Sequence, residues 1–402
     1  MNTPMRMLSV AAFAAALAGC ASAPPDYPQP TAAMQAIIDK DIARHFGDAP
    51  VDPGPLATDL SPALTPQAID HALRKVADWQ LPRTTAHLDR IWTSSVLYTG
   101  FMAASEATGD SKYRDAMFRM AQGFDWKLRD DRPYPNADDI SIAQTYLELY
   151  LRDPRPENAR WIADTRRHLD TLLPLQTLKP DDERLPWWWC DALFMAPPVW
   201  VKMYQATGER KYLDYMHAQW RRTSELLYDR DEHLYARDAG YIGKREPNGR
   251  RIFWSRGEGW VLGGLARTLD VLPPDDPQRP FYVRQLREMA ARIAALQGPD
   301  GLWHAGLLDP ATWPLAETSG SALFVFGMAY GVNHGYLDAA TYRPVIEKAW
   351  AGLLRHVYAD GRLGGIQQTG AEPAYYRPSS SYNYGVGAFL LAGAELKRMV
   401  KE

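Results

Sequence analysis

The sequence predicts an all-α protein, an (α/α)6 toroid in which six inner helices are surrounded by six outer ones. Apolar residues recur every three or four positions between breaks of Gly, Pro and Asp, and no credible alternating strand pattern interrupts them. The phrase at residues 107–113 recurs in similar form at residues 206–212, which fits repeating units of roughly fifty residues. The segments form six consecutive pairs, and the second helix of each pair is the more apolar.

Start and stop signals place twelve helices. Thr65 and Pro66 begin the first one, with Thr as the N-cap and Pro in the first turn. The predicted helices cover residues 66–80, 90–107, 111–124, 139–152, 157–173, 190–206, 210–227, 258–272, 277–297, 317–335, 339–357 and 383–399. Pro197 and Pro198 fall inside the third inner helix, so they must either kink it or make residues 191–196 a separate turn.

The connections between the helices are unequal in length. Helices that are apolar on most sides, such as 258–272, are expected inside the ring, and amphipathic ones such as 277–297 face water. The long connections all enter inner helices, and they are residues 174–189, 228–257, 298–316 and 358–382. Long ordered loops in a compact domain are usually functional. The end of the toroid where the inner helices begin is therefore the predicted active face.

The first residues read as an export signal. Arg6 precedes a short apolar run, and Leu-Ala-Gly-Cys at residues 17–20 resembles the bacterial lipoprotein signal, whose Cys is lipid-modified. Residues 1–20 are thus a predicted lipoprotein signal peptide with Cys20 as the lipidation site, and an ordinary signal peptide ending at residues 21–23 is the alternative. The protein is expected to be exported and held by this anchor on the periplasmic side of the bacterial outer membrane.

The remaining chain divides into two parts. Residues 21–60 are a predicted tether and N-terminal segment, because prolines between residues 24 and 30 keep the chain extended, and residues 61–402 form the catalytic domain. The formal net charge is -3 and basic residues form no run, so nucleic acid is not an expected partner. No phosphate-binding loop, serine elbow or metal-ligand spacing occurs, so no metal or other cofactor is expected. The chain has two cysteines, and a lipidated Cys20 would leave Cys190 unpaired, so no disulfide is expected.

Acidic residues with aromatic neighbours stand where the inner helices begin. They are Asp138, Asp139, Asp191, Glu258 and Glu317. Each has a structural alternative, because acids at a helix N-terminus cap free backbone N–H groups. Asp191 is the best candidate for a catalytic acid, since its apolar neighbours raise the pKa of a carboxyl group until it can donate a proton. Asp139 is expected to be the second catalytic carboxylate and to raise that pKa further by repulsion.

An arginine between two tryptophans offers a second sugar-binding feature. Trp254 and Trp260 flank Arg256 in a Gly-rich turn. The guanidinium fork suits a sugar carboxylate, and aromatic faces suit stacking on sugar rings. The structural alternative is an ion pair between Arg256 and Glu258.

Four phrases, taken in order, resemble those of glycoside hydrolase family 105, the unsaturated rhamnogalacturonyl hydrolases, and more distantly family 88. They lie at residues 138–146, 188–196, 254–260 and 317–321. The resemblance implies an (α/α)6 toroid acting on oligosaccharides that end in a 4,5-unsaturated uronic acid. It also implies hydration of the C4=C5 bond: an Asp protonates C4 and helps water add at C5, and the hemiketal then opens and expels the rest of the chain.

The resemblance assigns roles to particular residues. Asp191 matches the acid/base and Asp139 the second family aspartate. The candidate substrate-binding residues are Trp92, Asp138, Trp189, Arg237, Trp254, Arg256, Glu258 and Trp260. Arg237 stands close to where many relatives carry a His, and it is expected to hold the uronate instead. Two alternatives remain: an inverting hydrolase of saturated glycosides that uses Asp139 and Asp191 as base and acid, and a sugar-binding surface lipoprotein without catalysis.

Overall fold

The structure, a computed structural model, describes residues 31–400, and most of these residues are helical. The helices are α1 (Ala32–His45), α2 (Pro66–Ala86), α3 (Trp92–Thr108), α4 (Ser111–Gly123), α5 (Ala137–Ile140), α6 (Ala143–Arg152), α7 (Arg160–Leu172), α8 (Ala192–Met195), α9 (Pro197–Thr207), α10 (Arg210–Leu227), α11 (Ser255–Val271), α12 (Arg279–Ala294), α13 (Thr318–Asn333), α14 (Ala339–Leu354) and α15 (Asn383–Met399), with the 3-10 turns η1 (Pro156–Asn158) and η2 (Ala239–Tyr241). Strands β1 (Tyr228–Asp229) and β2 (Leu234–Tyr235) form an antiparallel hairpin.

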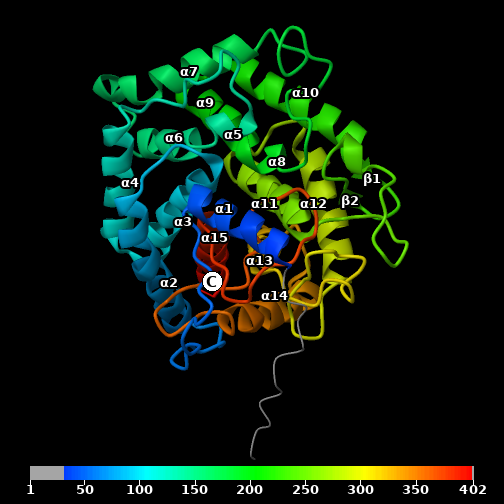
Figure 1. Cartoon of the computed structure of the whole chain (residues 1–402). Coiled ribbons are helices and arrows are strands. Elements are labelled where there is room, and N and C mark those ends of the chain that lie inside the picture. The colour runs from blue at the N-terminus through cyan, green and yellow to red at the C-terminus, as the bar shows by residue number, and fades with distance from the viewer. Residues whose placement is uncertain (1–30, 401–402) are drawn as a thin grey trace, which may run out of the picture.

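Six helices form a closed inner ring (Figure 1). Helix α3 contacts α6, α6 contacts α9, α9 contacts α11, α11 contacts α13, α13 contacts α15, and α15 returns to α3. Outside the ring, α2, α4, α7, α10, α12 and α14 pack on the inner helices that neighbour them in sequence. The (α/α)6 toroid predicted from the sequence is confirmed.

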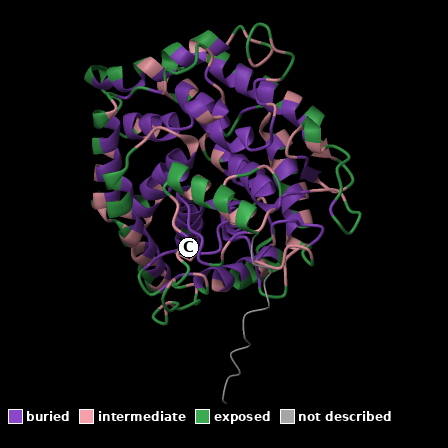
Figure 2. Cartoon of the chain, viewed as in Figure 1, coloured by how far each residue is buried: buried purple, intermediate pink, exposed green. Residues whose placement is uncertain are grey.

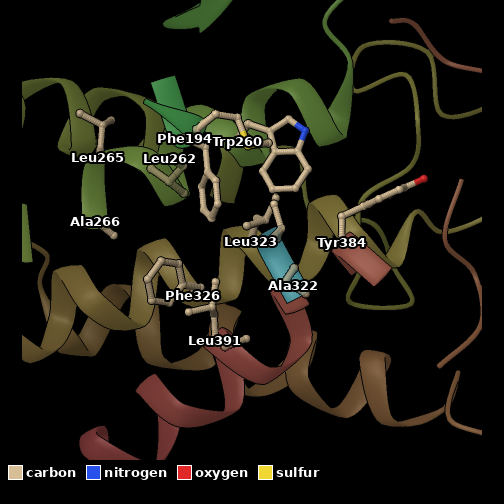
Figure 3. Packing of buried hydrophobic residues seen from close by; sticks show 14 of the residues in the cluster. Phe194, Trp260, Leu262, Leu265, Ala266, Ala322, Leu323, Phe326, Tyr384 and Leu391 are labelled. Carbon is tan, nitrogen blue, oxygen red and sulfur yellow. The ribbon is translucent and has the colours of Figure 1, made fainter. Parts of the chain in front are cut away.

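The inner helices are buried because apolar and small residues surround them. Nearly every position of α13 and α15 is buried, whereas α10 and α12 bury mainly one face. Figure 2 shows the result as a buried centre within a partly exposed rim. Glycines allow close approach: a Cβ on Gly100 of α3 would lie 2.7 Å from the Cα of Gly387 in α15. At the centre of the ring, Phe194, Trp260 and Leu323 gather in the core (Figure 3).

Two predicted inner helices are divided near their starts. The prolines lie in the first turn of α9, where a backbone N–H has no partner within the helix, so its absence costs no hydrogen bond. Helix α8 precedes α9 as a separate turn. Of the two outcomes expected for Pro197 and Pro198, the second is observed. The predicted helix 139–152 is divided into α5 and α6, and the hydroxyl of Ser141 donates to the carbonyl oxygen of Asp138 (2.7 Å) where α5 ends.

Helix α1 lies within a segment for which no helix was predicted. Thr31 caps it by accepting a hydrogen bond from the N–H of Met34 (3.3 Å). The helix runs across the front of the ring in Figure 1. The predicted signal peptide at residues 1–20 and the prolines at residues 24–30 lie outside the described residues. Within residues 31–400, every helix is too short or too polar to cross a bilayer.

Candidate active site

A cavity of about 240 Å³ opens at the end of the ring where the inner helices begin. Its lining residues are Arg44, His45, Trp92, Asp138, Trp189, Asp191, Met195, Arg237, Thr369 and Gly370. Three of the four long predicted loops contribute to it, namely residues 174–189, 228–257 and 358–382. The cavity thus brings together five of the predicted site residues: Trp92, Asp138, Trp189, Asp191 and Arg237.

Asp191 is held at the cavity by backbone pairing between two loops. Trp189 forms an antiparallel bridge with Asp238. The N–H of Cys190 donates a hydrogen bond to the carbonyl oxygen of Arg237 (2.9 Å). Helix α8 begins directly afterwards, with Asp191 as its N-cap residue. This pairing sets the Asp191 carboxyl group within the electrostatic influence of the Arg237 guanidinium.

The surroundings of Asp191 favour its protonated form. The residue is 9% exposed, and burial is the main cause that raises the pKa of its carboxyl group. The positive charge of Arg237 acts in the opposite direction, as does the thiol of Cys190, whose Sγ lies 3.2 Å from Oδ1. The net direction of the pKa is upward, which is the direction predicted from the sequence.

Asp138, on α5, supplies the second carboxyl group of the cavity. Burial, followed by the negative charges of Asp191 and Asp139, raises the pKa of Asp138 to about 7. Two carboxyl groups that interact in this way titrate as a pair and retain a proton near neutral pH. One member can therefore donate a proton while the other is ionised.

Asp139 is not among the residues that line the cavity, and its catalytic role stays a prediction. Its Oδ2 accepts a hydrogen bond from the N–H of Asn136 (3.0 Å), and its own N–H donates to Oδ1 of Asn136 (3.0 Å). This reciprocal arrangement is a capping box at the start of α5. Arg132 adds an ion pair at 3.4 Å. Asp139 therefore holds the short helix that presents Asp138, and its negative charge also contributes to the raised pKa of Asp138.

Arg256 is fully buried beneath loop 358–382 and does not line the cavity. Its Nη1 and Nη2 donate to the carbonyl oxygens of Gln367 (2.9 Å) and Gln368 (2.7 Å). The guanidinium lies 4.3 Å from the centre of the Trp254 ring. Its ion-pair partner is Glu317 (3.7 Å), not Glu258. Its donors hold the loop that forms one wall of the cavity, and its positive charge also acts on the ionisation of Asp191. The role of Arg256 in holding a sugar carboxylate stays a prediction.

The two remaining glutamates also support loops. Both carboxyl oxygens of Glu258 lie within hydrogen-bond distance of the N–H of Tyr235 (2.9 and 3.0 Å), and burial raises the pKa of Glu258 well above its usual value. Glu317 caps α13 by accepting from the N–H groups of Ser319 (3.3 Å) and Gly320 (2.6 Å). Helix capping, the structural alternative for these acids, is observed for Glu317, whereas Glu258 binds an N–H group of strand β2. The sugar contact of Glu258 stays a prediction.

The tryptophans divide between the cavity and the core. Trp254 is buried and donates its indole N–H to Oε1 of Gln367 (2.9 Å). Trp260 is fully buried, and its ring lies 4.9 Å from that of Phe194 (Figure 3) and 6.0 Å, edge-on, from that of Trp92. Neither of these two is among the residues that line the cavity, and their role in sugar binding stays a prediction. Trp92 and Trp189 do line it.

Arg237 is the cavity arginine that suits a uronate. Its Nη1 donates to Oδ2 of Asp238 (2.7 Å), and its guanidinium lies 5.4 Å from the centre of the Trp188 ring. Its Nε is buried and has no hydrogen-bond partner within residues 31–400. A guanidinium held in this way at the cavity, within the electrostatic influence of Asp191, can bind a carboxylate.

Five residues of the cavity were not predicted as site residues: Arg44, His45, Met195, Thr369 and Gly370. Arg44 and His45 end α1, a helix for which the sequence offered only Thr31 as a start signal after a run of prolines. Met195 belongs to a phrase that was recognised, but its side chain has no polar chemistry to single it out. Thr369 and Gly370 lie in the longest stretch of loop 358–382 without any regular element.

A larger cavity of about 350 Å³ lies at the opposite end of the toroid, where the inner helices end. Acids and bases on its walls neutralise one another in the ion pairs Lys202–Glu148 (3.0 Å), Arg152–Glu106 (2.8 Å) and Arg398–Glu395 (2.9 Å). It contains none of the predicted site residues. Within residues 31–400, no group of three or more His, Cys, Asp and Glu is arranged to hold a metal ion.

Comparisons with known proteins place the chain among glycoside hydrolases. Residues 65–400 match the family described as Glycosyl Hydrolase Family 88. Two relatives named unsaturated 3S-rhamnoglycuronyl hydrolase come from Formosa agariphila (39% identical, covering 82% of this chain and 91% of the relative) and Alteromonas sp. strain LOR (31%, 85% and 89%). A solved structure of a glycosyl hydrolase family 88 protein from Bacteroides vulgatus is 34% identical, with a TM-score of 0.77 over 83% of this chain and 99% of that one.

Proposed function

This chain belongs to glycosyl hydrolase family 88, one of the two related families that its motifs indicated, and we propose that it removes a 4,5-unsaturated uronic acid from the non-reducing end of oligosaccharides produced by polysaccharide lyases. The relatives at 39% and 31% identity, both named unsaturated 3S-rhamnoglycuronyl hydrolase, support this reaction. Their name also supports rhamnose as the sugar next to the unsaturated uronate. The observation that carries the proposal is the buried Asp191 carboxyl group, with its raised pKa, beside Arg237 in one cavity.

The reaction begins with proton transfer to an enol ether. Asp191 gives its proton to C4, and the electron pair of the C4=C5 bond forms the new C–H bond. The positive charge that develops at C5 is shared with the ring oxygen. The Asp191 carboxylate then accepts a proton from water as the water oxygen bonds to C5. Asp191 is thereby protonated again, and the sugar has become a hemiketal.

The hemiketal then opens without further help from a nucleophile. The bond between C5 and the ring oxygen breaks, C5 becomes a ketone, and the ring oxygen remains on C1 as a hydroxyl group. This hemiacetal collapses to an aldehyde, and the bond from C1 to the next sugar breaks with release of its hydroxyl group. One water is consumed in total. The protein therefore has to supply a proton donor and orientation, but no covalent intermediate.

The other cavity residues fit supporting roles in this reaction. The uronate carboxylate is attached to C5, next to the carbon that Asp191 protonates, so its binding group must lie beside Asp191. Arg237 meets that requirement. Asp138, whose pKa is about 7, keeps the pair of acids singly protonated near neutral pH. Trp92 and Trp189 offer apolar faces to the sugar ring.

The loss of ultraviolet absorbance by the enol ether of an unsaturated disaccharide tests the proposal directly. Asp191→Asn keeps the size of the side chain but has no acidic proton, so we expect kcat to fall about 10²- to 10⁴-fold. Asp181→Asn, at an exposed position in the loop before Asp191, is the matched control and should retain native activity. Full activity of Asp191→Asn would contradict its role. Turnover of saturated glycosides with anomeric inversion would favour the inverting alternative.

We also propose that Cys20 carries a lipid and that the exported protein is held on the periplasmic side of the outer membrane. The support is the Leu-Ala-Gly-Cys phrase at residues 17–20 and the proline-rich residues after it. A fatty-acid probe should label the native protein and not Cys20→Ser, which should be found in the soluble fraction. Release of the native protein from membranes by high salt alone would count against the anchor.

A further inference from the structure

Helix α1 precedes the part of the chain that matches the family, yet it reaches the active-site cavity. The match begins at residue 65, whereas α1 spans Ala32–His45. The last turn of α1 places Arg44 and His45 among the residues that line the cavity. Part of the site is therefore built by a segment outside the matched region.

Contacts with loop 358–382 fix the position of α1. The carboxylate of Asp41 accepts hydrogen bonds from the N–H (3.1 Å) and the hydroxyl group of Thr369, which also lines the cavity. After the helix, Asp48 and Ser381 exchange two backbone hydrogen bonds of 2.9 and 2.7 Å. The loop that forms one wall of the cavity thus also positions Arg44.

The two arginines of the cavity differ in their surroundings. Arg237 is mostly buried, forms an ion pair with Asp238 and influences the ionisation of Asp191. Arg44 is exposed at the rim, and no hydrogen bond or ion pair within the described chain engages its guanidinium. Next to it, His45 is buried, its Nδ1 has no hydrogen-bond partner within residues 31–400, and its Nε2 lies 3.6 Å from the carboxylate of Asp41. Among the residues that the structure describes, the guanidinium of Arg44 is therefore unpaired at the rim, and the unpartnered Nδ1 of the buried His45 follows it in the chain.

The position of these donors indicates which part of a substrate they meet. The proposed function places the terminal uronate beside Asp191 and Arg237, so the next sugar lies toward the exposed rim. A free guanidinium there matches an oxyanion, which it can bind through two parallel hydrogen bonds. We propose that Arg44, with His45 beside it, forms a subsite for an anionic substituent, a sulfate ester or a carboxylate, on the sugar next to the unsaturated uronate. This inference rests on the proposed function.

Three unsaturated disaccharides test the subsite: one whose second sugar is sulfated rhamnose, one with unsulfated rhamnose, and one with a uronic acid. Arg44→Gln should raise KM about tenfold for an anionic second sugar, equivalent to about 1.4 kcal/mol, with kcat unchanged. Arg44→Gln should leave KM and kcat for the unsulfated rhamnose substrate unchanged. Lys40→Gln removes the same charge from an exposed position of α1 outside the cavity, and it should behave like the native enzyme on all three substrates.

The outcomes separate the ligand classes. A rise in KM confined to the sulfated substrate identifies a sulfate subsite, and a rise confined to the uronic acid identifies a carboxylate subsite. An equal change of KM for all three substrates, or an unchanged KM for both anionic substrates, overturns the subsite. The proposed function still stands in that case, provided that the native enzyme turns the substrates over. A native enzyme that consumes none of the three overturns the proposed function and this inference with it.

Discussion

Asp138 lies close enough to Asp191 for the two ionisations to be linked: burial, and next the negative charge of Asp191, raises the pKa of Asp138 to about 7. The pKa of Asp191 is also raised, chiefly by burial. A pair of this kind loses its protons in two steps that belong to the pair. The form that serves the proposed reaction carries one proton, which the pair shares and which Asp191 must hold when it protonates C4.

The pH dependence of turnover should follow this shared proton. As the pH rises through about 7, the pair loses its last proton and kcat should fall. Asp138→Asn removes the neighbouring negative charge, and the loss of this charge lowers the pKa of Asp191. The residual activity of the variant should therefore fall at a lower pH than the activity of the native enzyme. Measurements of kcat between about pH 5 and about pH 9 check both statements. A profile that stays flat over this interval would contradict the shared proton.

The same pKa predicts an effect on stability. Between its ordinary pKa of 3.8 and about 7, the Asp138 carboxyl group binds more protons in the folded chain than in the unfolded one. The free energy of unfolding therefore decreases as the pH rises through this interval and levels off above it. Asp138→Asn removes that loss, so the variant should be more stable than the native protein above about pH 7. Near pH 5 the difference in the free energy of unfolding should be smaller. Urea unfolding measures the difference, with Asp181→Asn as an exposed control.

Asp139→Asn should have the opposite effect on stability. Its carboxylate closes the capping box with Asn136 and pairs with Arg132. Weakening these contacts should lower the free energy of unfolding by about 1 kcal/mol. It should also lower kcat, because α5 would no longer hold Asp138 in place. Both variants should lose kcat, but their stabilities should differ. Above about pH 7, Asp138→Asn should be more stable than the native protein and Asp139→Asn less stable, and this difference distinguishes the cavity acid from the positioning residue. Unchanged stability of Asp139→Asn would contradict the capping role.

Most of the fold could be predicted because its signals are local. Helix α10 and helix α15 begin and end where the sequence predicted, since Gly, Pro and polar breaks bound a clear apolar spacing. The pair Pro197 and Pro198 marked a division that the structure shows. Helix α1 was missed because its main contacts are distant: Asp41 binds Thr369, more than three hundred residues later. Such contacts leave no trace in local spacing.

The site was only partly predictable for a related reason. The position of Asp191 could be inferred, because its apolar neighbours are adjacent in sequence. The choice between Asp138 and Asp139 depends on which way one short helical turn faces, and the capping by Asn136 decides it. Arg256 was expected to bind sugar because arginine between tryptophans suits that task. Its actual partners, Gln367 and Gln368, belong to a loop more than a hundred residues away.

Replacement of Arg256 by lysine should therefore act mainly on stability. The guanidinium donates to two carbonyl oxygens and lies 3.7 Å from the buried carboxylate of Glu317. One ammonium group cannot reproduce this fork, so Arg256→Lys should lower the free energy of unfolding by about 3 kcal/mol in urea titrations. Arg245→Lys is the control, because the exposed Arg245 side chain donates, within residues 31–400, only to the carbonyl oxygen of Gly249 (2.8 Å). Equal losses in the two variants would contradict the supporting role of Arg256.

The contact between Asp41 and Thr369 should control how well the rim of the cavity is formed. Asp41→Asn weakens the two hydrogen bonds that tie α1 to loop 358–382, so we expect KM to rise severalfold. The constant kcat should change little, because Asp191 is positioned by Arg237 and not by α1. Asp39→Asn, at an exposed position of the same helix, should leave both constants unchanged. A fall in kcat at constant KM would show instead that α1 acts on the proton donor itself.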